Sequence, residues 1–73
     1  MIDQPADDEE FGWVLAKDMR HMTGALRRMD DTRWEARYSL NGEVYLTEVL
    51  RSRELAEQHL AQHKDALHAA GWR

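Results

Sequence analysis

Two histidines four residues apart are the residues in this chain whose spacing could hold a metal ion. His59 and His63 would share one face of a helix, which is how helices offer two imidazoles to one metal. The zinc-protease pattern needs a glutamate directly after the first histidine, and Leu60 stands there. The chain has no cysteine, so a further ligand would have to come from His21, Glu48 or another chain. We therefore expect no metal and no cofactor, with His59 and His63 as the only metal candidates.

A structural role explains these histidines better. In the helix expected over residues 52–70, His63 falls at the centre of the apolar stripe and His59 at its margin. We predict that His63 is hydrogen-bonded in the core. A partly buried histidine would make folding or assembly sensitive to pH between about pH 5 and pH 7.

Arginines gather around the expected sheet. They are Arg27, Arg28, Arg33, Arg37, Arg51 and Arg53. Together with Tyr45 they could form a nucleic-acid surface, because basic and aromatic side chains on a sheet contact phosphates and bases. However, residues 20–53 hold seven bases and five acids, a net charge of only +2. We therefore favour a solvated face with cross-strand ion pairs, and keep nucleic-acid binding as the alternative.

No catalytic residue set is evident. The chain lacks a cysteine nucleophile and a glycine-rich phosphate loop, and Ser39 and Ser52 occupy expected turn and cap positions. A chain of 73 residues rarely encloses the concave pocket that catalysis uses. We therefore do not expect an enzyme.

The clearest structural pattern is a β-hairpin centred on Asn41-Gly42, since both residues tolerate positive φ. Residues 33–39 alternate polar and apolar, and residues 43–50 are rich in β-branched and aromatic types, so both segments are predicted strands.

Two registers are open for this hairpin. A two-residue turn would pair Ser39 with Val44 and Trp34 with Val49. A three-residue loop over residues 40–42 would pair Tyr38 with Val44 and Ala36 with Leu46. We prefer the latter, because it gathers the apolar residues on one face. They are Trp34, Ala36, Tyr38, Val44, Leu46 and Leu50. Glu48 then turns toward the apolar face, opposite Trp34.

A closing helix is predicted over residues 52–70. Ser52 is the expected N-cap, and Glu54 in the first turn suits the helix dipole. Gly71 fits the left-handed position after the last turn, which would place Trp72 against Leu67. The helix is long enough to lie along the hairpin and cover its apolar face.

The N-terminal third is predicted to begin with a disordered acidic leader over residues 1–7, followed by one domain over residues 8–73. A helix from Asp8 would have a stripe of Phe11, Val14, Leu15, Met19 and Met22 and would end at Thr23-Gly24. Trp13 would be exposed on its far side as an interaction residue. Residues 25–29 could be a further strand, which we favour, or a continuation of the helix.

Together these patterns predict a small α+β domain with an N-terminal helix, a two- or three-stranded antiparallel sheet and a C-terminal helix.

The net charge is −4, but residues 11–73 carry ten bases and nine acids, or +1. No signal peptide or membrane span is evident, so we expect a cytoplasmic protein. A domain this small buries little surface, which favours self-association. We expect a homodimer or another protein partner, contacted through a sheet edge or through Trp13, Tyr45 and Val49.

Overall fold

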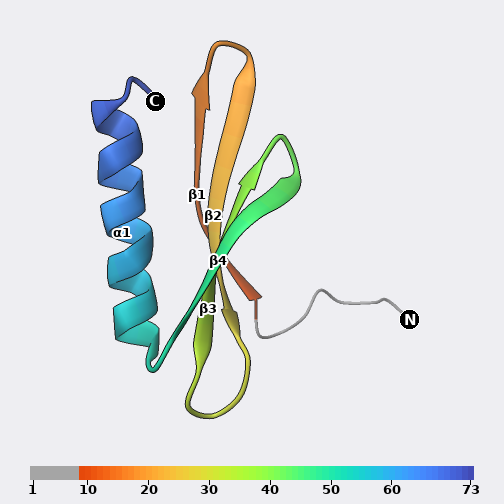
Figure 1. The fold of residues 1–73 in the computed structure, drawn as a ribbon, viewed down its shortest axis with the longest axis vertical. Coiled ribbons are helices and arrows are strands. Elements are labelled where there is room, and N and C mark those ends of the chain that lie inside the picture. The colour runs from red at the N-terminus through yellow and green to blue at the C-terminus, as the bar shows by residue number, and fades with distance from the viewer. Residues whose placement is uncertain (1–8) are drawn as a thin grey trace.

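A four-stranded antiparallel sheet followed by one helix makes up the fold (Figure 1). The computed structural model describes residues 9–73, so the predicted leader over residues 1–7 lies outside the described part. The elements are β1 (Glu9–Lys17), β2 (Arg20–Arg28), β3 (Trp34–Leu40), β4 (Glu43–Leu50) and α1 (Arg53–Ala69). The strands follow one another in the order β1-β2-β3-β4, and α1 covers one face of the sheet (Figure 1). The opposite face is free of helices among the described residues.

The predicted N-terminal helix is wrong, because residues 9–28 form a hairpin of β1 and β2. Asp18 and Met19 have φ of 51° and 67°, which bends the chain in a two-residue turn. Buried Trp13 and Leu15 alternate with exposed Val14 and Ala16, the period of a strand. The helical stripe included Met19, which is 94% exposed at the turn. The preferred strand over residues 25–29 is largely confirmed within β2, and the sheet has four strands, more than predicted.

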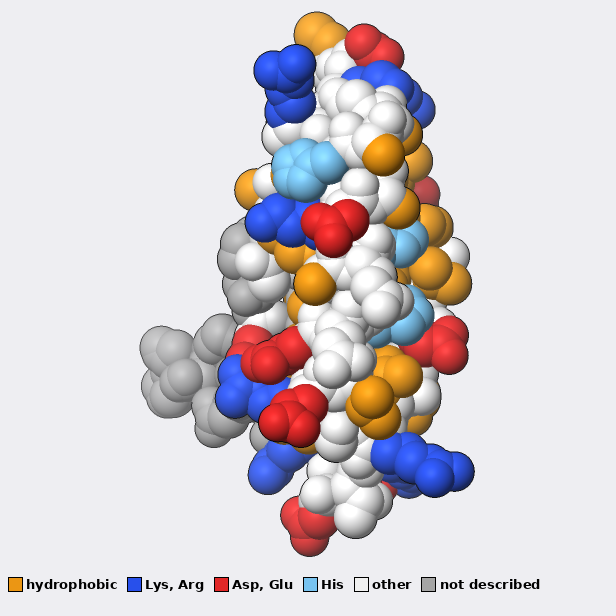
Figure 2. Space-filling model, turned by 90° about the vertical axis from the view of Figure 1, so that its left-hand side faces the viewer, with side chains coloured by type: hydrophobic (Ala, Val, Ile, Leu, Met, Phe, Trp, Pro, Cys, Tyr) orange, Lys and Arg blue, Asp and Glu red, His pale blue; other side chains and the backbone are white. Residues whose placement is uncertain are grey.

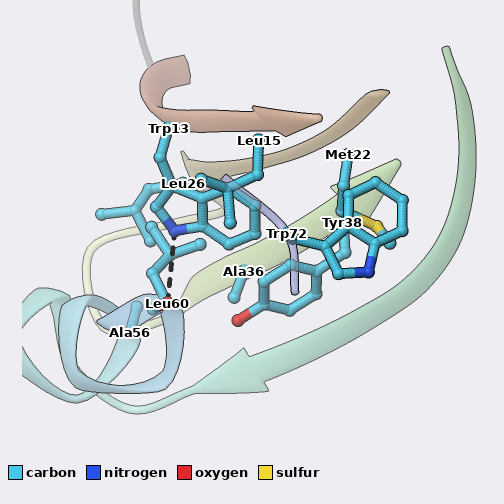
Figure 3. Close-up of a cluster of buried hydrophobic side chains, with 9 residues drawn as sticks. All are labelled: Trp13, Leu15, Met22, Leu26, Ala36, Tyr38, Ala56, Leu60 and Trp72. Atoms are coloured by element: carbon cyan, nitrogen blue, oxygen red, sulfur yellow. Dashed lines mark hydrogen bonds between the residues drawn. The ribbon is translucent and has the colours of Figure 1, made fainter. Parts of the chain in front are cut away.

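Trp13 forms the contact that joins the N-terminal hairpin to the helix. Its side chain is 8% exposed, so the prediction that it is exposed is wrong. The indole N–H donates a hydrogen bond to the Leu60 carbonyl oxygen of α1 at 3.2 Å (Figure 3). A Cβ on Gly24 would lie 2.6 Å from the indole ring and 2.9 Å from the side chain of Leu60. Gly24 is therefore not a helix cap. It lies within β2, and because it has no side chain, the indole of Trp13 can pack directly against the strand.

The core lies between the sheet and α1. Figure 3 shows that it draws on all parts of the fold except β4. Its buried members are Trp13, Leu15, Met22, Leu26, Ala36, Tyr38, Ala56, Leu60 and Trp72. Trp34, Leu40, Leu50 and Leu67 pack against this cluster while remaining partly exposed. The core is thus centred on β1, β2 and β3, and β4 lies at its margin.

The Asn41-Gly42 turn is confirmed, but neither predicted register holds along the whole hairpin. The turn has two residues, with φ of 51° and 88°, and Ser39 pairs with Val44. A bulge at Tyr45 then shifts the pairing, so that Tyr38 pairs with Leu46 and Trp34 with Leu50. The bulge keeps the residues of the predicted apolar face on the helix-covered side, except for Val44, which moves to the other face.

Helix α1 begins and ends as predicted. The Leu55 N–H donates to Oγ of the N-cap residue Ser52 at 3.1 Å. At the C-terminal end, the Trp72 N–H donates to the Leu67 carbonyl and the Gly71 N–H to that of His68, both at 3.0 Å. These two bonds define a Schellman motif and bury Trp72 in the core. Within residues 9–73 no helix has the length and apolar character needed to cross a membrane.

Replacing Gly24 with alanine tests the contact with Trp13. The added Cβ would collide with the indole, and overpacking of this kind costs roughly 1–3 kcal/mol. We expect Gly24→Ala to lower the free energy of unfolding by about this amount in urea denaturation. Thr23→Ala, on the opposite face, is the control and should cost about 0.5 kcal/mol or less. Equal stability of the two variants would contradict the proposed packing.

Candidate functional site

Two tyrosines and two histidines form a cluster where α1 meets β3 and β4, here called the Tyr–His seam (Tyr38, Tyr45, His59 and His63). The Tyr38 hydroxyl lies 2.6 Å from Nδ1 of His59, and the Tyr45 hydroxyl lies 2.8 Å from Nε2 of His63. The rings of Tyr38 and His63 stack with centroids 4.0 Å apart. Figure 2 shows histidine and hydrophobic side chains next to one another along one flank of the helix.

Burial sets the protonation of the seam. It raises the pKa of Tyr38 far above the ordinary range, with smaller contributions from Tyr45 and Glu48. Burial also raises the pKa of Tyr45. It lowers the pKa of His63, and the neighbouring His59 lowers it further. Both phenols therefore stay protonated near neutral pH, and the uncharged form of His63 is favoured.

The Tyr–His seam therefore holds the helix against the sheet. A phenol with a raised pKa is a poor base and a poor nucleophile. Across residues 9–73, histidines and carboxylates do not gather in groups of three or more that could hold a metal. The two Tyr–His hydrogen bonds instead tie α1 to the third and fourth strands. His63 is part-buried and hydrogen-bonded, as predicted, but its partner Tyr45 was not among the residues predicted for the apolar face of the hairpin.

The predicted arginine surface is divided among several parts of the fold. Arg27 and Arg37 lie on the helix-free face, where both approach the Glu35 carboxylate at 4.0 and 3.4 Å. Arg33 lies in the loop after β2 and contacts Asp30 at 2.7 Å. This contact, together with the hydrogen bonds that Thr32 donates to the same carboxylate, lowers the pKa of Asp30 to about 2.

Arg53 and the two remaining arginines lie elsewhere. Arg53 begins α1 and pairs with Glu10 at 2.5 Å and with Glu57 at 3.3 Å. Arg28 is the last residue of β2, and its side chain also takes part in an interaction. Arg51 directly follows β4. The arginines do not form one continuous basic face, and acidic side chains accompany most of them. Of the pairs described here, the one between Arg27 and Glu35 joins two strands, as expected from the sequence, whereas the others lie within β3, within the loop or at the start of α1.

The two edges of the sheet differ in how they are protected. At β1, the Ala16 N–H donates to the Arg73 carbonyl at 2.8 Å, and the Arg73 N–H donates to the Ala16 carbonyl at 3.0 Å. The register of β1 is also interrupted between Phe11 and Trp13. A covering segment is one of the usual means of preventing edge-to-edge association, and it distinguishes β1 from β4, whereas a bulge is present in both strands. The edge formed by β1 is therefore partly closed.

The edge formed by β4 is open. No strand within residues 9–73 pairs with its outer side, and seven of its eight residues are exposed. Its exposed apolar side chains are Val44, Tyr45, Leu46 and Val49. The strand holds no lysine and no proline, the residues that commonly discourage pairing at an edge. Two predicted interaction residues, Tyr45 and Val49, lie here at 47% exposure each, whereas Trp13 does not.

The sequence predicted self-association through a sheet edge, but it did not identify which edge. The apolar, lysine-free run over residues 43–50 was a usable signal. With only two or three strands predicted, however, the edge of the sheet could not be assigned. Comparison with protein-family models, with curated proteins and with solved structures gives no match for the chain.

The lowered pKa of His63 predicts that stability falls in acid. A histidine whose pKa is lower in the folded state binds its proton more readily when unfolded. Stability should therefore be complete above the ordinary histidine pKa of 6.5 and fall as the pH drops through the lowered pKa of His63. The titratable groups next to His63 are His59 on α1, Tyr38 on β3 and Tyr45 on β4. Urea denaturation at a series of pH values would measure the effect.

His63→Phe supplies the test of this assignment. Phenylalanine keeps a ring against Tyr38 but cannot titrate, so the fall in stability between neutral and mildly acidic pH should become shallower. His21→Gln is the control, because the His21 side chain is exposed, and it should retain the wild-type slope. An unchanged slope in His63→Phe would show that another group is responsible.

Proposed function

We propose that this protein is a non-catalytic binding module that takes up an extended segment of a partner polypeptide along β4. The observation that carries the proposal is the open edge of β4, beside an opposite edge that is partly closed. In strand addition, a partner's backbone hydrogen-bonds to the edge, and side chains on alternate positions provide specificity. The exposed apolar residues of β4 supply such side-chain contacts.

The Tyr–His seam supports this role by fixing the strand before a partner arrives. Tyr45 is the bulged residue of β4, and its hydroxyl bonds to His63 of the helix. On the other side, β4 pairs with β3 from Trp34 to Leu40. A strand held on two sides loses little conformational freedom on binding, and this preorganisation favours affinity.

Nucleic-acid binding through the arginines remains the alternative predicted from the sequence, and we do not advance it. It would require Arg27 and Arg37 to leave the Glu35 carboxylate, and Arg33 to leave Asp30. The open edge requires no such rearrangement. The absence of cysteine from the chain suits a reducing compartment, and we propose a cytoplasmic location.

A matched pair of valines tests the proposed edge. Val14 on β1 and Val49 on β4 are 51% and 47% exposed, and both lie on the helix-free face. An array of short extended peptides with alternating apolar and polar residues would serve as the probe. We expect wild-type protein and Val14→Lys to bind a common subset of these peptides. Val49→Lys should lose most of this binding, because an edge lysine opposes strand pairing.

Circular dichroism and thermal unfolding would establish that both lysine variants remain folded. Equal loss of binding in the two variants would assign the interaction to the helix-free face as a whole. Binding that survives Val49→Lys, or no peptide binding by the wild type, would refute strand addition at β4.

A further inference from the structure

We infer that the partner seated on β4 is a second copy of this chain, in an antiparallel pair of β4 strands with a two-fold axis at Thr47. This inference rests on the proposed function, because it names the partner for the same edge. It joins two four-stranded sheets into one continuous sheet. Three features of the chain support it: the order of charges along β4, the side chains on its helix-free face, and the closure of the β1 edge.

The charges at the two ends of β4 favour antiparallel self-pairing. Glu43 begins the strand, and Arg51 directly follows its last residue, Leu50. An antiparallel neighbour of identical sequence brings the end of β4 that carries Arg51 in each copy next to the end that carries Glu43 in the other. A parallel neighbour would instead place like charges together at both ends. Opposite charges across neighbouring strands stabilise pairing, and like charges oppose it.

The side chains of β4 select the register. Val44, Thr47 and Val49 pair with Ser39, Arg37 and Glu35, which are alternate residues of β3, so all three lie on the helix-free face. With Thr47 on the axis, and with the bulge at Tyr45 absorbing one residue, Val44 of each copy lies opposite Val49 of the other. On the helix-free face the contact then consists of β-branched side chains, which pack well across strands.

The neighbouring symmetric register is disfavoured by a charge. An axis at Glu48 would place the two Glu48 carboxylates directly opposite each other on the helix-covered side. Like charges in that position are destabilising. With the axis at Thr47, Glu48 of each copy instead lies opposite Leu46 of the other.

The partly closed β1 edge explains why association would stop at two copies. A head-to-tail contact between β4 and β1 would leave free edges and extend into a filament. The backbone pair between Ala16 and Arg73 occupies one position on the β1 edge. A two-fold contact between β4 strands pairs the open β4 edge of one copy with that of the other, so no open β4 edge remains for a third copy.

Single cysteines introduced into this cysteine-free chain test the register. Residues opposite each other in an antiparallel pair have Cβ atoms about 4.5–5.5 Å apart, and a small adjustment permits a disulfide. Under mild oxidation, Thr47→Cys should form a covalent dimer on its own. Val44→Cys and Val49→Cys should each link poorly alone, but an equimolar mixture should link efficiently. Non-reducing electrophoresis separates the products.

Light scattering and charge reversal add measurements that do not depend on cysteine. The unmodified chain should show a dimer mass at high concentration, and Arg51→Glu should weaken the dimer several-fold. Restoration of the dimer in Glu43→Arg/Arg51→Glu would support the antiparallel order. A weakened dimer in the double variant would overturn it.

The remaining outcomes separate this inference from the proposed function. A monomer mass at every concentration, without cross-linking, overturns self-pairing. The peptide array with Val49→Lys then decides independently whether β4 binds a different polypeptide. Efficient cross-linking by Glu48→Cys with none by Thr47→Cys overturns the register. A dimer that is unaffected by Val49→Lys overturns the use of β4 for self-association.

Discussion

The insertion of Trp13 between β2 and α1 is the contact on which the rest of the structure depends. A single helix must cover a four-stranded sheet, and one large side chain fills the centre of the layer between them. The indole occupies the space left by the missing side chain of Gly24 and hydrogen-bonds to the Leu60 carbonyl. Tyr38 lies on its sheet side, with ring centroids 6.0 Å apart. From this position the helix is close enough for the Tyr–His seam to form.

The seam and the open edge are linked through Tyr45. Because the core is centred on the first three strands, β4 receives little help from buried apolar contacts. The hydrogen bond between Tyr45 and His63 compensates in part by fixing the bulged residue of β4 to the helix. The outcome is an exposed strand that is nevertheless held in shape. Exposure alone would favour fraying, whereas exposure with a fixed backbone favours recognition.

The sequence predicted the C-terminal half of the fold well and the N-terminal third poorly. Ser52, Gly71 and Asn41-Gly42 carry strong local preferences, and local preference is enough to place caps and turns. The segment around Trp13 has no such residue: its apolar positions fit a helix as well as a strand, and Gly24 resembles a helix stop. Its role became clear only from packing against Leu60, a residue far away in the sequence.

The candidate site could be predicted only in part from the sequence, for the same reason. Tyr45 and Val49 were identified as interaction residues, but the bulge that turns Tyr45 toward His63 has no local signal. Likewise, pairing of the arginines with Glu35 and Asp30 follows from strand register and loop geometry. These features are set by the sheet as a whole, so they could not be read from any short stretch of the chain.

The backbone pair between Ala16 and Arg73 has a consequence for the order of folding. Every strand pair in the sheet joins neighbours in the sequence, so each closes a short loop at a small entropic penalty. The contacts of Trp13 with Leu60 and of Ala16 with Arg73 span most of the chain and close much longer loops. During synthesis the strands can therefore pair first, while the apolar face of the sheet stays uncovered until the helix has left the ribosome.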